Sequence, residues 1–140
     1  MVNFVFLQSI LLGLYLMTTI NISNLSNPGF SITAQLAQSF LSKFLGLMFK
    51  KELLINQGIV LAENYESKFS ASIHMLFMNF DICVVWLDKD LRVIDVKHAK
   101  KWHFAYFPKK AAQYVLELHF SKISEFNLGD QLQFEYEKNI

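Results

Sequence analysis

Apolar and polar residues alternate along much of the chain with the short period that is typical of strands. From Phe30 to Leu36, apolar residues occupy every second position, which predicts a strand with one buried face. The uninterrupted apolar run from Cys83 to Leu87 predicts a strand that is buried in the core. Turn-forming residues follow at 88–90, and the apolar residues within 93–96 then predict the second strand of a hairpin.

Further short apolar segments extend this pattern to six or seven strands. They lie at residues 58–61, 73–80, 114–118 and 132–136, with a turn at 128–130 and a short helical turn within 120–127. In one stretch the apolar residues instead recur at steps of three and four, which predicts a helix, and they are Phe40, Leu41, Phe44, Leu45 and Met48. The sequence therefore predicts an α+β, mostly β domain, formed by a small antiparallel sheet or barrel-like structure with one packed helix.

The N-terminal part of the chain is uncharged, because no Asp, Glu, Lys or Arg precedes Lys43 among the 140 residues. As a helix, the apolar stretch Phe4 to Ile20 would be roughly 26 Å long, which is close to the hydrocarbon thickness of a bilayer. We therefore predict an N-terminal transmembrane helix as an anchor at residues 1–20, a linker rich in Asn and Ser at 21–29, and a β-rich globular domain at 30–137.

Two alternatives for residues 1–20 remain open. One is a cleaved secretory signal, although no Lys or Arg precedes the apolar run and no clear small-x-small cleavage site follows it. The other is a buried helix or strand of the domain, although the run shows no polar face. Two N-glycosylation tripeptides, at 21–23 and 24–26, favour an extracytoplasmic domain. The predicted location is therefore the membrane, as a single-pass protein with its domain outside the cytoplasm.

Charge and cysteine content exclude several classes of function. The net charge of +1 provides no basic face for nucleic acid, so we expect no nucleic-acid partner. Cys83 is the single cysteine, which excludes an intramolecular disulfide and a cysteine zinc cluster. The sequence also contains no P-loop, GxGxxG, HExxH or GxSxG motif. These absences disfavour the common enzyme classes, and we expect no cofactor.

Four segments, taken in order along the chain, resemble the family named domain of unknown function 192. They are Gly46–Lys50, Ser72–Met78, Val84–Asp88 and Val115–Leu118 together with Gly129-Asp130. The resemblance extends from about Phe30 to Phe134. It implies a compact β-rich fold with one packed helix and no established activity. Some members that the chain resembles also carry N-terminal export or anchor segments.

The chain departs from the pattern of this family at three places. Lys50 stands where the family has an arginine after its GLM motif. Asp81 and Cys83 stand where the family has the proline and the aspartate of a Pro-Ile-Asp sequence. Ser121 stands where the family has a glycine after the LEL strand. Any site that depends on that arginine, carboxylate or glycine would be altered in this chain.

The segments that carry the resemblance suggest a ligand site where the GLM segment meets residues 73–78. Lys50 and His74 would supply its polar groups, and Phe77 and Met78 its apolar walls. A soft metal held by His74 and Met78 is an alternative, but methionines in an apolar run more often fill a core, and we predict no metal site. Glu117 either faces solvent or, as the resemblance suggests, pairs with Lys50.

The segment from Lys97 to Lys110 combines five lysines with interleaved aromatic residues. This composition fits a solvated loop, a groove for single-stranded nucleic acid, or a surface that contacts anionic lipid. With an anchor nearby, contact with anionic lipid is the better of the two binding interpretations. The segment also contains His98 and His103, but nothing in the sequence brings Asp95 or Cys83 against them, and we predict no catalytic residue.

These features favour a membrane-tethered, extracytoplasmic domain that binds a ligand or assists another protein and has no catalytic activity of its own. The N-terminal segment would hold it at the membrane, and the chemistry of a small-molecule ligand is not specified. One alternative is a small hydrolase or redox enzyme with a pocket near Lys50, His74 and Cys83. The other is a protein-interaction scaffold with exposed rings between Trp102 and Phe107.

Overall fold

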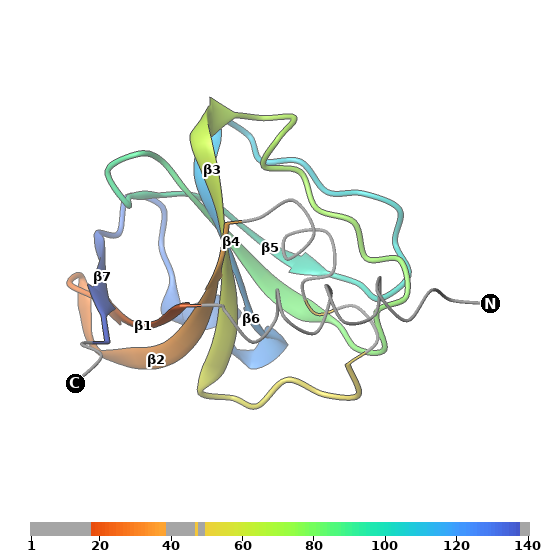
Figure 1. The fold of residues 1–140 in the computed structure, drawn as a ribbon, viewed down its shortest axis with the longest axis horizontal. Coiled ribbons are helices and arrows are strands. Elements are labelled where there is room, and N and C mark those ends of the chain that lie inside the picture. Colours follow the sequence, from red (N-terminus) through yellow and green to blue (C-terminus); the bar gives the residue numbers. More distant parts are fainter. Residues whose placement is uncertain (1–17, 39–46, 48–49, 138–140) are drawn as a thin grey trace.

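The computed structural model describes residues 18–38, 47 and 50–137, and these form a sheet with little helix (Figure 1). The elements are β1 (Thr18–Asn24), β2 (Asn27–Ala37), β3 (Gln57–Ser67), β4 (Ile82–Leu87), β5 (Val93–Ala99), β6 (Ala112–His119), the 3₁₀ helix η1 (Phe120–Glu125) and β7 (Leu132–Tyr136). The predicted mostly β fold class is confirmed. The predicted hairpin is β4–β5, and the predicted helical turn is η1.

The strands form one seven-stranded sheet in the order β5-β4-β6-β3-β2-β1-β7. All neighbouring strands are antiparallel except β2 and β3, which are parallel. The sheet curls until its two edges meet. An antiparallel β-bridge between Arg92 and Gln131 marks this contact. The backbone N–H of Val93 also donates to the carbonyl of Asp130 at 2.9 Å. This contact protects part of each edge strand and gives the domain its barrel-like form.

The inner, concave face of the curled sheet encloses the first of two hydrophobic cores. Period-two alternation in β2 supplies four of its residues, because Phe30, Ile32, Ala34 and Leu36 are buried while the residues between them are exposed. This confirms the alternation that the sequence predicts. Phe30 packs edge-to-face on Phe126, with ring centroids 4.9 Å apart, beside η1 at one end of the sheet.

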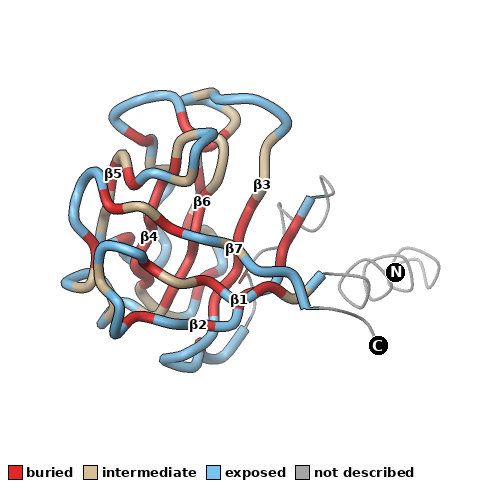
Figure 2. Tube along the Cα trace, turned by 90° about the vertical axis from the view of Figure 1, so that its left-hand side faces the viewer, coloured by how far each residue is buried: buried red, intermediate tan, exposed pale blue. Residues whose placement is uncertain are grey.

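The outer, convex face of β3, β4 and β6 is covered as well, which creates a second core. All six residues of β4 are buried, and Figure 2 shows that buried positions concentrate on β4 and β6. The cover consists of the β3–β4 loop (68–81) and the β5–β6 loop (100–111), together with Leu47 and Leu53. Trp86 of β4 is fixed to this cover, because its Nε1 donates to the carbonyl of Ala71 at 2.7 Å.

The N-terminal boundary of the domain differs from the expectation. Residues 18–20 belong to β1 rather than to a membrane helix, and residues 21–29, expected as a linker, form the β1–β2 hairpin. Ile20 and Ile22 are fully buried in the inner core and alternate with more polar residues, so this segment packs against protein. Residues 1–17 of the predicted anchor lie outside the described part. Within the described ranges, no helix has the length and apolar character needed to cross a bilayer.

Two further expectations concern the connection from β2 to β4. The predicted helix around residues 40–48 lies outside the described residues, apart from Leu47, which is buried in the outer core. The predicted strand at 73–80 is wrong, because this segment forms turns and a single bridge from Ile73 to Tyr106. Phe77 has a φ of 60°, which ends any extended conformation there, and the N–H of Met78 turns back to the carbonyl of Met75.

The close approach of β3 and β6 at Gly58 generates a prediction about stability. A Cβ atom at Gly58 would lie 2.6 Å from Leu118 Cδ2 and 2.9 Å from the carbonyl oxygen of Glu117. Because that oxygen belongs to the backbone of a central strand, it cannot move aside. We expect Gly58→Ala to lower the free energy of unfolding by about 1–3 kcal/mol in urea denaturation.

Gly29→Ala is the matched control, because a Cβ there would meet no atom closer than Asn27 Oδ1 at 3.9 Å. We expect it to change the free energy of unfolding by less than about 0.5 kcal/mol. Equal effects of the two substitutions would show that β3 and β6 are not packed this closely.

Candidate functional site

The β3–β4 and β5–β6 loops carry most of the side chains that the sequence singles out, and they are joined to each other along their length. Ile73 and Tyr106 exchange two backbone hydrogen bonds, at 3.0 and 2.9 Å. The N–H of Met75 donates to the carbonyl of His103 at 3.1 Å, and the N–H of Trp102 donates to the carbonyl of Met75 at 2.9 Å. Figure 1 shows the two loops side by side, in yellow-green and cyan. The loops therefore form one connected layer.

This layer presents two large rings to solvent. Phe77 is 46% exposed and Trp102 is 57% exposed, and their rings meet edge-to-face with centroids 5.3 Å apart. Both residues have left-handed backbones, with φ of 60° and 64°, and such a conformation costs a bulky residue about 1–3 kcal/mol. We call Phe77 and Trp102 the aromatic pair. Strain in both loops at the same exposed contact marks the aromatic pair as a candidate functional site.

Further exposed rings and cations lie in the β5–β6 loop. Phe104 is 77% exposed and Phe107 is 47% exposed. Four lysines of the segment are also exposed, and they are Lys100, Lys101, Lys109 and Lys110. Lys97 is different, because its Nζ donates to the carbonyl of Phe107 at 2.7 Å and lies 3.6 Å from the carboxylate of Asp95. Lys97 therefore fixes the loop instead of facing a partner.

Two aspartates hold the ends of the β5–β6 loop. Asp81 accepts from the N–H of Lys101 at 2.9 Å and contacts His98 Nε2 at 2.9 Å. The hydrogen bond from the Lys101 backbone is the largest effect on the pKa of Asp81; burial opposes it, and His98 adds to it, so the pKa lies below its ordinary value. Asp95 is 1% exposed and accepts from the N–H of Lys109 at 3.0 Å. The loop is thus anchored near both of its ends.

The four residues of the predicted ligand site lie in or beside this layer. Lys50 is exposed, and its carbonyl accepts a hydrogen bond from Asn79 Nδ2 at 2.7 Å, which places it next to the β3–β4 loop. His74 is half-buried, Phe77 is one of the two rings of the aromatic pair, and Met78 is buried in the outer core. Met78 packs in a core as an ordinary apolar residue. A pocket formed by these four side chains stays a prediction.

Two further kinds of chemistry concern metal ligands and the thiol of Cys83. In the described ranges, no group of three or more His, Cys, Asp or Glu side chains could hold a metal ion. Cys83 is fully buried in the inner core, and burial, with a smaller effect of Glu125, raises the pKa of its thiol to about 12. His98 lies opposite Cys83 in the sheet, but its Nε2 contacts Asp81. Cys83 therefore lacks the exposure and the thiolate that a nucleophile needs.

Glu117 does not face solvent, contrary to one of the two expectations for it. It lies on β6 between Ile59 of β3 and Val84 of β4, on the face that the two loops cover, and it is 6% exposed. Burial raises the pKa of its carboxyl group to about 7. No ion pair between Glu117 and Lys50 is present among the described side chains. The sequence did not predict this burial. Glu117 lies between two Leu residues, so alternation alone assigns it to the polar face of the strand.

Comparisons with known proteins agree on a family without an assigned activity. The model of the family described as Uncharacterized ACR, domain of unknown function 192 (DUF192), matches residues 23–134. The chain is 51% identical over 83 residues to the UPF0127 protein TK1120 of Thermococcus kodakarensis, covering 59% of this chain and 51% of that protein. It is 36% identical over 106 residues to a UPF0127 protein of Thermococcus sibiricus, covering 74% of this chain and 67% of that protein. The chain thus spans about half the length of the first of these relatives.

Two solved structures have the same fold. A putative transcription regulator from Sinorhizobium meliloti superposes with a TM-score of 0.75 at 16% identity, covering 84% of this chain and 93% of that one. A protein of unknown function from Novosphingobium aromaticivorans superposes with a TM-score of 0.71 at 18% identity, covering 84% of each chain. At these identities the likeness concerns the fold alone.

The burial of Cys83 predicts how the thiol reacts. Because the thiol is enclosed and its pKa is raised, we expect iodoacetamide to leave the native protein unmodified at neutral pH and to alkylate it fully after denaturation. Intact-mass spectrometry measures the result. Rapid alkylation of the native protein would instead support an enzyme that uses Cys83.

The burial of Glu117 predicts a pH dependence of stability. Since its folded pKa is raised from 4.5 to about 7, the folded state binds this proton more tightly than the unfolded chain, and stability falls as pH rises through that interval. Glu117→Gln removes the effect. We expect the variant to be more stable than the parent by about 3 kcal/mol above pH ~8, and the difference to vanish below pH ~4.5.

Thermal and urea unfolding at several pH values measure this difference. Glu135→Gln is the matched control, because Glu135 is exposed on β7 and should give the same pH profile as the parent. A Glu117→Gln variant that is less stable than the parent at pH ~8 would show that the carboxylate is favourably paired.

Proposed function

Because the chain belongs to the DUF192 family of uncharacterised proteins, we propose a function from the geometry of the two joined loops. The domain is a non-catalytic binding or accessory module that works at a membrane surface. The aromatic pair contacts the headgroup region, and the exposed lysines of the β5–β6 loop contact anionic lipid. The uncharged residues 1–17 would tether the chain, with the domain on the extracytoplasmic side.

The observation that carries this proposal is the exposed, strained contact between Phe77 and Trp102 beside clustered lysines. Tryptophan is favoured at membrane interfaces, because its ring has a large apolar surface and a polar N–H. Each lysine near an anionic surface adds about 1 kcal/mol of attraction. The segment 97–110 itself contains no Asp or Glu, and of the two aspartates that contact it, Asp95 is buried and lies 3.6 Å from Lys97. The same loops are joined by backbone hydrogen bonds, so little ordering is needed when they bind.

A catalytic alternative is less well supported. An enzyme that uses Cys83 needs an accessible thiolate, and the thiol lies in the inner core with a raised pKa. A protein-interaction scaffold would use the same exposed rings, but a protein partner gives no particular reason for a segment with five lysines and no carboxylate. Charge complementarity therefore favours anionic lipid.

Tryptophan fluorescence tests the proposal in the full chain, even if its N-terminus is inserted in the bilayer. The protein has two tryptophans, and Trp86 is fully buried while Trp102 is exposed, so acrylamide quenching reports mainly on Trp102. We expect phosphatidylserine vesicles, but not phosphatidylcholine vesicles, to protect Trp102 from acrylamide. High salt should remove the protection, because it screens the lysines.

Replacing Lys100 and Lys101 by Gln, which removes two positive charges, should weaken binding of the loops to anionic vesicles by roughly thirtyfold, at about 1 kcal/mol per lysine. Lys68→Gln with Lys89→Gln is the matched control, because both residues are exposed but lie outside the β5–β6 loop. Equal quenching in the two kinds of vesicle, or equal losses in the two double variants, would contradict the proposal.

A further inference from the structure

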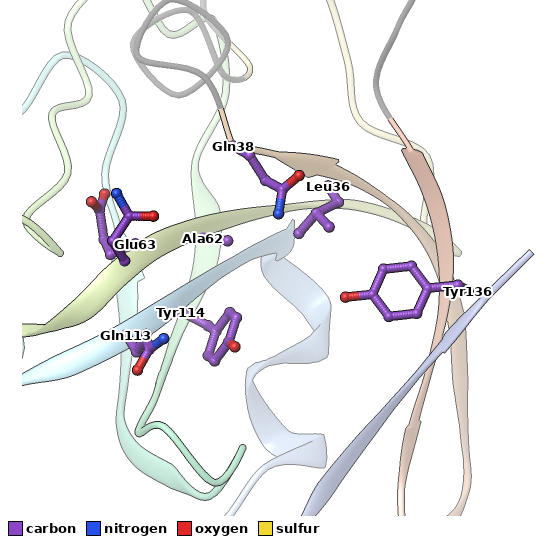
Figure 3. A pocket seen from close by; sticks show the side chains of 8 residues that line it. Leu36, Gln38, Ala62, Glu63, Gln113, Tyr114 and Tyr136 are labelled. Carbon is purple, nitrogen blue, oxygen red and sulfur yellow. The ribbon is translucent and has the colours of Figure 1, made fainter.

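A second surface lies at the open end of the curled sheet and shares no residue with the joined loops. It is a depression of about 260 Å³ between the ends of β2, β3, β6 and β7. Its polar lining consists of Gln38, Glu63, Asn64, Gln113, Tyr114 and Tyr136, and one leucine and one alanine complete it (Figure 3). We call this depression the mouth of the sheet. The proposed membrane contact makes no use of it.

The fold itself creates the mouth. β2 and β3 run parallel, and β2 ends opposite Leu61 while β3 continues, so Gln38 follows the end of one strand and Asn64 lies farther along the other. β7 is brought across from the far edge of the sheet, where Phe134 packs edge-to-face on Tyr114 with ring centroids 5.6 Å apart. Figure 3 shows the ring of Tyr136 reaching from β7 toward β2 across the depression. The lining residues therefore come from four strands and meet only in the folded domain.

The chemistry of the lining narrows the class of ligand. Three side-chain amides each offer donors and an acceptor, and one carboxylate and two phenol groups add further hydrogen-bonding groups. The described residues that line the mouth include no Lys, Arg, His or Cys, so phosphate, carboxylate anions and transition metals find no matching group among them. With two aliphatic residues among eight, the mouth is also a poor site for an acyl chain.

From this lining we propose that the mouth binds a neutral sugar. A sugar hydroxyl both donates and accepts, as do amides, and a carboxylate can accept from two neighbouring hydroxyls. The ring of Tyr136, which is 61% exposed, supplies flat apolar surface for the C–H face of a pyranose ring. A volume of about 260 Å³ lies just below the range of typical ligand pockets, which span about 300–1,000 Å³. The mouth therefore suits one sugar ring, either free or at the end of a glycan.

Saturation-transfer NMR with the full chain tests this inference. The probes are glucose, galactose, mannose and N-acetylglucosamine, with glucose 6-phosphate as an anionic probe and choline as a cationic one. We expect saturation transfer to at least one neutral sugar, with weak affinity in the range of about 1 mM that is usual for a small ligand with few contacts. Choline and glucose 6-phosphate should bind more weakly than that sugar.

Tyr136→Ala should lower the affinity for the sugar by roughly tenfold, because it removes one stacking face. Tyr65→Ala is the matched control, since Tyr65 is 65% exposed, close to the 61% of Tyr136, and lies on β3 outside the mouth. If Tyr136→Ala does not fold, Gln38→Ala carries the test, because Gln38 is exposed beyond the end of β2. Absence of transfer to every neutral sugar, tighter binding of choline, or an equal loss in Tyr65→Ala would overturn the inference. None of these outcomes bears on membrane binding.

Discussion

Burial of β4 and β6 on both faces is the constraint on which the rest of this structure depends. These strands are interior strands, second and third in the sheet order, and all six residues of β4 are enclosed. A curled sheet shields only its concave side, so the convex side of the same strands needs a separate cover. The β3–β4 and β5–β6 loops supply that cover, with Trp86 bonded to Ala71 and with Ile73 paired to Tyr106. Long connections that would otherwise be surface loops are therefore part of a core.

This constraint also explains where the sequence was informative and where it was not. Local patterns were sufficient to predict β2, whose alternating residues are alternately buried and exposed in the fold. They were also sufficient to predict β4, because the length and composition of its apolar run indicate a buried strand. The covered convex face could not be predicted in the same way. It depends on loops that follow other strands, so Glu117 carried the local pattern of a solvent-facing residue although it is enclosed.

The N-terminal boundary was missed for a different reason. An uncharged apolar sequence satisfies lipid and a protein interior equally well, so composition cannot separate the two environments. The distinguishing signal was the alternation of Ile20 and Ile22 with Thr19 and Asn21, which fits a strand with one buried face. The predicted strand at 73–80 is wrong because the backbone of Phe77 has a positive φ, and phenylalanine as a residue type does not predict a positive φ. The predicted site shares this difficulty, since its members lie outside the regular strands and helices.

The two candidate surfaces follow from the same closure of the sheet. Covering the convex face requires loops whose inner residues, such as Met75 and Met78, are committed to the core. Backbone pairing between these loops then fixes which residues face outward, and these include Phe77 and Trp102. At one end of the curled sheet, Phe126 packs on Phe30 beside η1. The depression that we call the mouth lies at the other end. Among the described residues, Cys83 is buried in the inner core and Glu117 is buried on the face that the two loops cover, so neither group is exposed on either candidate surface.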